Sequence, residues 1–168
     1  MTSPSAPKST ESEAHLKENE RKWTKPLMDA GWTCIPNVLI ERQLVLGLDA
    51  LDLNIILHLA ARWWKAEGKP HPSKGTIAKA MKVHPSTIRR RIQRMEREGL
   101  IRREERRVDA GSSKTNIYHL EGLIKHAAPY ADEKVAERAA AKEAREKAMA
   151  RKGRARVPLK VIDGGADE

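Results

Sequence analysis

The sequence contains one cysteine and no phenylalanine, and aromatic residues make up only 4% of its 168 residues. A single cysteine excludes an intramolecular disulfide and agrees with a reducing cytoplasm. Because Cys34 lies within an apolar run, we predict that it is a small core residue. With so few aromatic side chains, the core has to be mainly aliphatic.

Long apolar runs and catalytic motifs are missing as well. No stretch reaches the roughly 18–20 apolar residues that a membrane span needs, and the first 22 residues lack the apolar segment of a signal peptide. Neither phosphate-binding glycine loops nor H-E-x-x-H occur, and the six histidines share no metal-ligand spacing. We therefore expect a cytoplasmic protein that is not an enzyme and has no metal, cofactor or membrane partner.

The formal net charge of +10 is concentrated in one part of the chain. Residues 1–73 carry nine basic and nine acidic side chains, residues 74–107 carry twelve and four, and residues 108–168 carry twelve and ten. A localised basic segment predicts a nucleic-acid partner more strongly than a high overall pI does, because diffuse positive charge indicates only solubility and non-specific binding.

The middle of this basic segment, residues 85–99, has the pattern of a helix with one buried and one polar face. At about 100° per residue, the apolar side consists of Ile88, Ile92, Met95 and Gly99. The opposite side carries Ser86, Arg90, Gln93 and Arg97, with Thr87, Arg89 and Arg94 on the flanks. A narrow apolar stripe with an arginine-rich outer face suits insertion into the groove of a polyanion.

A shorter helix is predicted just before it. Ser73 is a suitable N-cap, and the apolar side consists of Ile77, Ala78 and Met81. A tight turn at residues 82–84 follows, with His84 as the next N-cap and Pro85 as the first helical residue, where its missing N–H costs nothing.

A two-stranded hairpin is predicted to follow the second helix. Residues 100–107 form the first strand, residues 109–113 are turn formers, and residues 115–120 form the returning strand. Tyr118 and Leu120 should point to the same side, because side chains alternate along a strand. Helix, turn, helix and hairpin together make a winged helix-turn-helix.

The run TIAKAMKVHPSTIRRRIQRMEREGLIRRE resembles the DNA-reading segment of bacterial winged helix-turn-helix proteins, including one-domain regulators. Together with GWTCIPNVLIERQLVLGLDALDLNIILHLA before it and KTNIYHL after it, it is similar to the N-terminal DNA-binding module of phage and plasmid replication proteins. The likeness covers residues 32–123. Lys82 stands where this turn often has glycine, at a cost of about 1 kcal/mol for a left-handed conformation, and His84 stands where Ser, Thr or Asp is common.

The segment before the basic region supplies the core helix. Residues 49–67 form the longest apolar helix, with Asp49 as N-cap, Asp52 three residues on, and Gly68 and Pro70 after its end. Its stripe consists of Leu51, Ile55, Leu59 and Trp63. Upstream, GWTCIP (residues 31–36) is a candidate strand for pairing with the wing, and residues 37–42 form a short helix in which Leu39 and Ile40 are buried.

The predicted fold class is mainly α with a small β-hairpin wing, a three-helix core and a charged C-terminal helix. Residues 1–22 are predicted to be a disordered arm and residues 23–128 the winged helix-turn-helix domain, ending in a short helix before Pro129. Residues 129–156 are a charged, alanine-rich helix and residues 157–168 a disordered tail. The apolar stripe of the C-terminal helix is thin, so we favour an exposed helix over one that forms a homodimer or holds a replication or transcription partner.

These elements predict binding of double-stranded DNA, with helix 85–99 in the major groove and wing 102–118 on the minor groove or backbone. The base-reading candidates are Ser86, Thr87, Arg89, Arg90 and Gln93; Arg90 suits guanine and Gln93 suits adenine. The phosphate and wing candidates are Lys74, Thr76, Lys79, Arg94, Arg97, Arg106, Arg107 and Lys114.

Several functions share this pattern. We favour a sequence-specific transcriptional regulator associated with the nucleoid or a plasmid. The alternatives are a plasmid or phage replication protein that binds origin DNA, an interaction module that does not bind DNA, and an RNA-binding protein. The arginines could also form a solvated face paired to Glu96, Glu98, Glu104 and Glu105.

Overall fold

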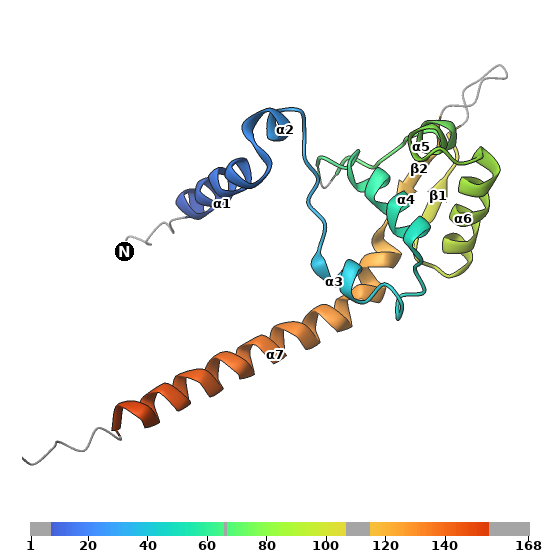
Figure 1. Cartoon of the computed structure of the whole chain (residues 1–168). Helices are drawn as coiled ribbons and strands as arrows, with labels where there is room; N and C mark the ends of the chain where they lie inside the picture. The colour runs from blue at the N-terminus through green and yellow to red at the C-terminus, as the bar shows by residue number, and fades with distance from the viewer. Residues whose placement is uncertain (1–7, 66, 107–114, 155–168) are drawn as a thin grey trace, which may run out of the picture. The chain divides into compact units, whose positions relative to one another are not determined.

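The structure, a computed structural model, describes residues 8–65, 67–106 and 115–154. The elements in chain order are α1 (Lys8–Trp23), α2 (Lys25–Asp29), α3 (Asn37–Glu41), α4 (Ala50–Ala60), α5 (Lys74–Met81), α6 (Pro85–Arg97), β1 (Arg102–Glu104), β2 (Ile117–His119) and α7 (Glu121–Arg154). The chain divides into two compact units, residues 1–126 and 127–168. In the first unit, α4, α5 and α6 surround the β1–β2 hairpin (Figure 1). This arrangement confirms the predicted fold class.

Helix α4 begins with the predicted capping arrangement. The side chain of Asp49 accepts hydrogen bonds from the backbone N–H groups of Leu51 and Asp52, and the Asp52 carboxylate accepts one from the N–H of Asp49. The helix ends at Ala60, seven residues before the predicted end at residue 67. The chain tightens just after this end, because the N–H of Trp63 donates to the carbonyl of Ala60, three residues earlier, and not to that of Leu59, four residues earlier.

Helices α5 and α6 meet at the predicted turn. Ser73 Oγ accepts from the N–H of Thr76 at 2.9 Å and so caps α5. Lys82 adopts the left-handed conformation, with φ 55° and ψ 37°. His84 caps α6 through Nδ1, which accepts from the N–H of Ser86 at 3.2 Å, and Pro85 is the first helical residue. The turn therefore lies at the predicted residues, and Lys82 takes the left-handed conformation in which glycine is common.

The core of the first unit is formed largely by aliphatic side chains. Ile88, Ile92 and Met95 are wholly buried on α6, as their spacing predicts, and Ile55 and Leu59 are wholly buried on α4. Gly99 ends α6 with φ 71°, and the N–H of Leu100 returns to the carbonyl of Met95 at 2.9 Å. The inner side of α6 is thus fixed along its whole length.

The wing is shorter than predicted. Strands β1 and β2 pair antiparallel with Arg103 opposite Tyr118, and residues 107–114, which include the predicted turn, lie outside the described residues. Tyr118 and Leu120 are both buried, as predicted. The proposed strand at residues 31–36 is absent, so that prediction is wrong. The linker after α4 lies beside β2 instead, because the N–H of Tyr118 donates to the carbonyl of Pro70 at 2.9 Å.

Two predictions about side chains before α4 also need correction. Cys34 is exposed, because the segment between α2 and α3 is not part of the core. Helix α3 ends at Glu41, and it buries Val38 and Leu39, whereas Ile40 is 46% exposed. A short helix buries only one side, and an apolar run alone does not define which side that is.

The N-terminal end contains more helix than the sequence predicts, and the two predicted C-terminal helices form one continuous helix. Residues 8–22, expected to be disordered, form most of α1, where Arg21 and Glu18 form an exposed ion pair one turn apart. Pro129 does not end a helix; it lies inside α7, which continues to Arg154. A proline at this position removes one hydrogen bond, and the surrounding alanine, glutamate and lysine residues favour helix strongly enough to continue. In the second unit the large apolar residues Val135 and Met149 are exposed.

None of the helices in the described part of the chain is long and apolar enough to cross a membrane.

Candidate nucleic-acid interface

The outer side of α6 presents the residues predicted to contact bases. Ser86, Arg89, Arg90, Gln93 and Arg97 are exposed, and Thr87 is half-buried at the side. Because the apolar side of the same helix is wholly buried, the orientation of the arginine-rich side is fixed by the core.

Three of the four nearby carboxylates are paired with other residues. Glu96 lies 3.4 Å from Arg103, and Glu104 accepts from His119 at 2.9 Å. Glu98 lies 3.8 Å from Arg94. Within the part of the chain that the structure describes, Arg89, Arg90 and Arg97 have no ion pair. Of the glutamates named in the alternative of a solvated face, Glu96, Glu98 and Glu104 therefore do not neutralise Arg89, Arg90 or Arg97.

A second group of positive charges lies where α5, α6 and β1 come together. Lys74 at the start of α5 is half-buried, and its pKa is lowered by burial and by the positive charges of Arg103 and Arg89. Like charges are costly at close range unless an anion balances them. Glu96, which lies 3.4 Å from Arg103, and Glu105 partly offset these positive charges. Lys74 and Arg89 are thus neighbouring cations beside the outer side of α6.

Arg94 does not belong to this surface, and its predicted role on a phosphate is corrected. Its guanidinium donates to the wholly buried carboxylate of Asp52, and to the carbonyl of Gly47 at 3.0 Å. One turn earlier, Arg91 lies 2.5 Å from the carboxylate of Asp49. Burial raises the pKa of Asp52, with Asp49 contributing and Arg94 opposing. These pairs attach α6 to the first turn of α4.

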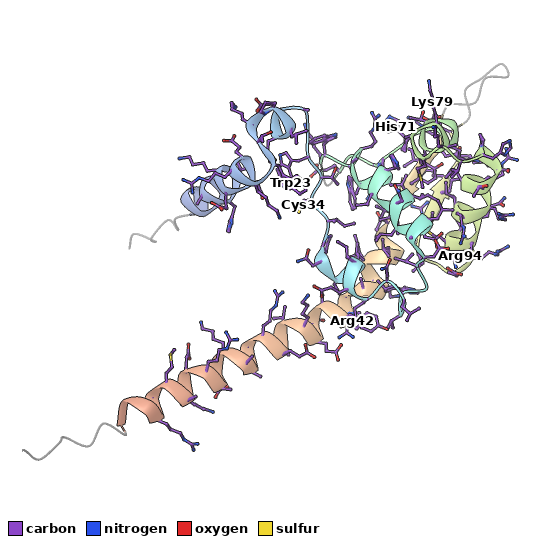
Figure 2. All side chains as sticks on the ribbon, viewed as in Figure 1. Trp23, Cys34, Arg42, His71, Lys79 and Arg94 are labelled. Atoms are coloured by element: carbon purple, nitrogen blue, oxygen red, sulfur yellow. The ribbon has the colours of Figure 1, made fainter. Side chains whose placement is uncertain are left out.

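The remaining candidates lie on α5 and the wing. Thr76 and Lys79 are exposed on α5, and Figure 2 shows Lys79 projecting outward. Arg106 is half-buried, and its Nε donates to the carbonyl of Thr115 at 3.0 Å across the hairpin. Arg107 and Lys114 lie outside the described residues. The described candidates thus come from both helices and the wing.

Sequence reasoning missed Arg103 and Arg91, and a signal for Arg91 was present. Asp52 shares the buried stripe of α4 with Ile55, Ile56 and Leu59. A carboxylate at such a position requires a cation on a neighbouring helix, and α6 is rich in arginine. No comparable signal pointed to Arg103, because its part in the cluster depends on where β1 begins relative to α5.

Residues 46–101 match a protein family described as helix-turn-helix domain. This stretch runs from just before α4 to just before β1. The chain contains a helix-turn-helix domain. With the β1–β2 hairpin after its second reading helix, the domain is of the winged type. In helix-turn-helix proteins that bind DNA, the second helix of the motif lies in the major groove. The corresponding helix in this chain is α6.

Two solved structures overlap with the chain more loosely. The N-terminal domain of the DnaD protein from Geobacillus kaustophilus is 18% identical, with a TM-score of 0.48, over 73% of this chain and 96% of that one. A transcriptional regulator is 20% identical, with a TM-score of 0.36, over 84% and 98%. No curated protein matches the chain. The assignment of the domain rests on the family match and on the arrangement of its elements.

Proposed function

We propose that the protein binds double-stranded DNA and acts as a sequence-specific transcriptional regulator on nucleoid or plasmid DNA in the cytoplasm. The observation that carries this proposal is the outer side of α6, where Arg89, Arg90 and Arg97 have no ion pair within the described residues while three of the four nearby glutamates are paired elsewhere. An arginine surface held outward by a buried core suits a polyanionic partner.

In the proposed complex, α6 enters the major groove, which displays a distinct donor and acceptor pattern for each base pair. Arg90 donates both arms of its guanidinium to O6 and N7 of a guanine, and Gln93 pairs with an adenine. Ser86, Thr87 and Arg89, near the start of α6, contact base edges or the adjacent phosphates. These roles give α6 both its affinity and its specificity.

Phosphate contacts surround the bases in this arrangement. Arg97 lies further along α6, and Lys74, Thr76 and Lys79 contact the backbone from α5. Lys74 and Arg89 lie beside the same phosphate. The wing approaches the neighbouring minor groove or backbone with Arg106. Such contacts fix the position of the domain but do not discriminate between sequences.

Salt titration with a 30-base-pair duplex (a length of about three helical turns) tests the proposal. If about five phosphates are neutralised, the logarithm of the binding constant falls against the logarithm of salt concentration with a slope of about −4 to −5. The double variant Arg89→Glu/Arg90→Glu should abolish binding. Arg138→Glu/Arg145→Glu, with two exposed arginines of α7, is the matched control. A slope near zero, or an equal loss in both variants, rejects the proposal.

Mapping the bound sites tests the regulatory role separately. Sites in promoters support regulation of transcription, whereas sites confined to origin repeats replace it with a role in replication. A homodimer or partner bound through α7 stays a prediction, and sedimentation of the full chain at several concentrations measures it.

A further inference from the structure

A second groove lies beside α5, outside the surface formed by α6. It has a volume of about 430 Å³ and is lined by Arg62, Trp64, His71, Pro72, Ser73, Thr76 and Thr115. These residues come from the linker after α4, the first turn of α5 and the start of the returning wing segment. We call it the Trp64 groove.

Trp64 is the most exposed aromatic residue of this groove, with 71% of its side chain accessible. Its neighbour Trp63 is half-buried, with Lys69 5.5 Å from the centre of its ring. Tryptophan and arginine are the residues most enriched where partners bind. An exposed tryptophan two residues from an exposed arginine therefore indicates a contact surface.

The chemistry of the lining favours an anionic partner. None of the seven lining residues carries a carboxylate, Arg62 is a permanent cation, and Ser73, Thr76 and Thr115 add hydroxyl groups. Cation, hydroxyls and one flat ring match the phosphate and sugar of a nucleic-acid backbone.

The groove is continuous with the candidate DNA interface. Thr76 belongs to both surfaces, and Lys74 is next to Ser73 in the chain. The linker that carries His71 is held beside the wing by the hydrogen bond from the Tyr118 N–H to the Pro70 carbonyl. A duplex bound against α5 would therefore reach the groove without a change in the fold.

We propose that the Trp64 groove binds the sugar–phosphate backbone of duplex DNA that flanks the base pairs contacted by α6. This inference rests on the proposed function. Arg62 pairs with a phosphate, and the ring of Trp64 packs against a deoxyribose. The groove adds affinity and lengthens the bound segment, but it does not select a sequence.

Two variants have different expected signatures on the 30-base-pair duplex of about three helical turns. Arg62→Ala removes one phosphate contact, so it should lower affinity and make the salt slope shallower by about 1. Trp64→Ala removes an uncharged contact, so it should lower affinity about threefold to tenfold with the slope unchanged. Trp64→Phe should restore most of the loss. Circular dichroism melts should match those of the unmodified protein, because both side chains are exposed.

The chain offers a matched control. Arg21 and Trp23 have the same spacing and are also exposed, so Arg21→Ala and Trp23→Ala should leave affinity and slope unchanged. If Arg62→Ala and Trp64→Ala have no effect while Arg89→Glu/Arg90→Glu abolishes binding, this inference fails and the proposed function stands. If the unmodified chain does not bind the duplex, the proposed function fails. If Trp64→Ala lowers the affinity for a single-stranded 30-mer (about three helical turns when paired) more than the affinity for the duplex, the inference is overturned. The result would then indicate that the tryptophan stacks on bases.

Discussion

The guanidinium of Arg94 on α6 donates to the carboxylate of Asp52 on α4, and that carboxylate is wholly buried. The same oxygen of Asp52 accepts from the N–H of Asp49 at 3.0 Å. Asp52 therefore caps its own helix and holds the DNA-facing helix at the same time. Because this carboxylate makes both a helix cap and a buried ion pair, its removal should destabilise the protein far more than removal of an exposed carboxylate.

We expect Asp52→Ala to lower the free energy of unfolding by about 3 kcal/mol, because it breaks a buried pair and a helix cap together. Urea denaturation measures the change. In a double-mutant cycle with Arg94→Ala, the coupling energy should exceed about 1 kcal/mol. Arg97→Ala, at an exposed position of α6, should change stability by less than about 0.5 kcal/mol. Additive effects of Asp52→Ala and Arg94→Ala would show that the pair is not a stabilising contact.

Arg90 and Arg97 should affect DNA binding differently. Arg90→Ala should cost about 1–3 kcal/mol and relax the preference at one base pair, because the arginine contacts a base. Arg97→Ala should lower the affinity for all DNA sequences alike. It should also make the slope of log binding constant against log salt concentration shallower by about 1. Binding measured over all single-base-pair changes of a selected site separates the two. A sequence-dependent loss for Arg97→Ala would mean that the assignment of the two arginines is wrong.

Lys82→Gly should stabilise the protein by about 0.5–1 kcal/mol, because glycine adopts the left-handed conformation of this turn without steric cost. Thermal unfolding measures the gain. Gly99 has a similar conformation, with φ 71°, and a Cβ there would meet no atom within 4 Å. Gly99→Ala should therefore cost about 1 kcal/mol through the backbone alone. A loss of stability in Lys82→Gly would show that the lysine side chain makes a stabilising contact.

The ion pair between Lys69 and Glu121, 2.5 Å apart, should give a pH-dependent contribution to stability. The pKa of Glu121 is lowered from 4.5, mainly by the hydrogen bond from Lys69. The contribution is therefore present above pH 4.5 and is lost as the pH falls through the lowered pKa. Glu121→Gln should reduce stability at about pH 7 by less than about 1 kcal/mol, because Glu121 is exposed. Near pH 3 the variant and the unmodified protein should unfold alike.

Denaturation of Glu137→Gln provides the control for this pH dependence, since Glu137 is exposed on α7. Its stability should follow that of the unmodified protein at both pH values. A pH-independent loss in Glu121→Gln would assign the effect to packing and not to charge.

Local patterns predict the reading helices well. The spacing of Ile88, Ile92 and Met95 defines the buried side of α6, and Ser73 and Pro85 mark where α5 and α6 begin. These features depend on residues within one or two helical turns, so the sequence contains all the information they need. The sequence placed the turn at residues 82–84, but the left-handed conformation of Lys82 was known only from the structure.

Features that depend on distant residues could not be predicted in this way. Arg94 has the same local surroundings as the exposed arginines of α6, and only the position of Asp52, forty-two residues earlier, assigns it to the protein's own structure. The segment 31–36 contains apolar residues that suit a strand, but Pro70 occupies the place beside β2. In both cases a partner far away in the sequence decides the outcome.

The two sides of α6 divide stability and recognition between different residues. Ile88, Ile92, Met95, Arg91 and Arg94 hold the helix in place, whereas Arg90 and Gln93 are exposed on its outer side. Replacing Arg90 and Gln93 should therefore leave the protein as stable as before. The preferred DNA sequence could be reprogrammed by a few substitutions, and relatives with new targets could arise without passing through poorly folded intermediates.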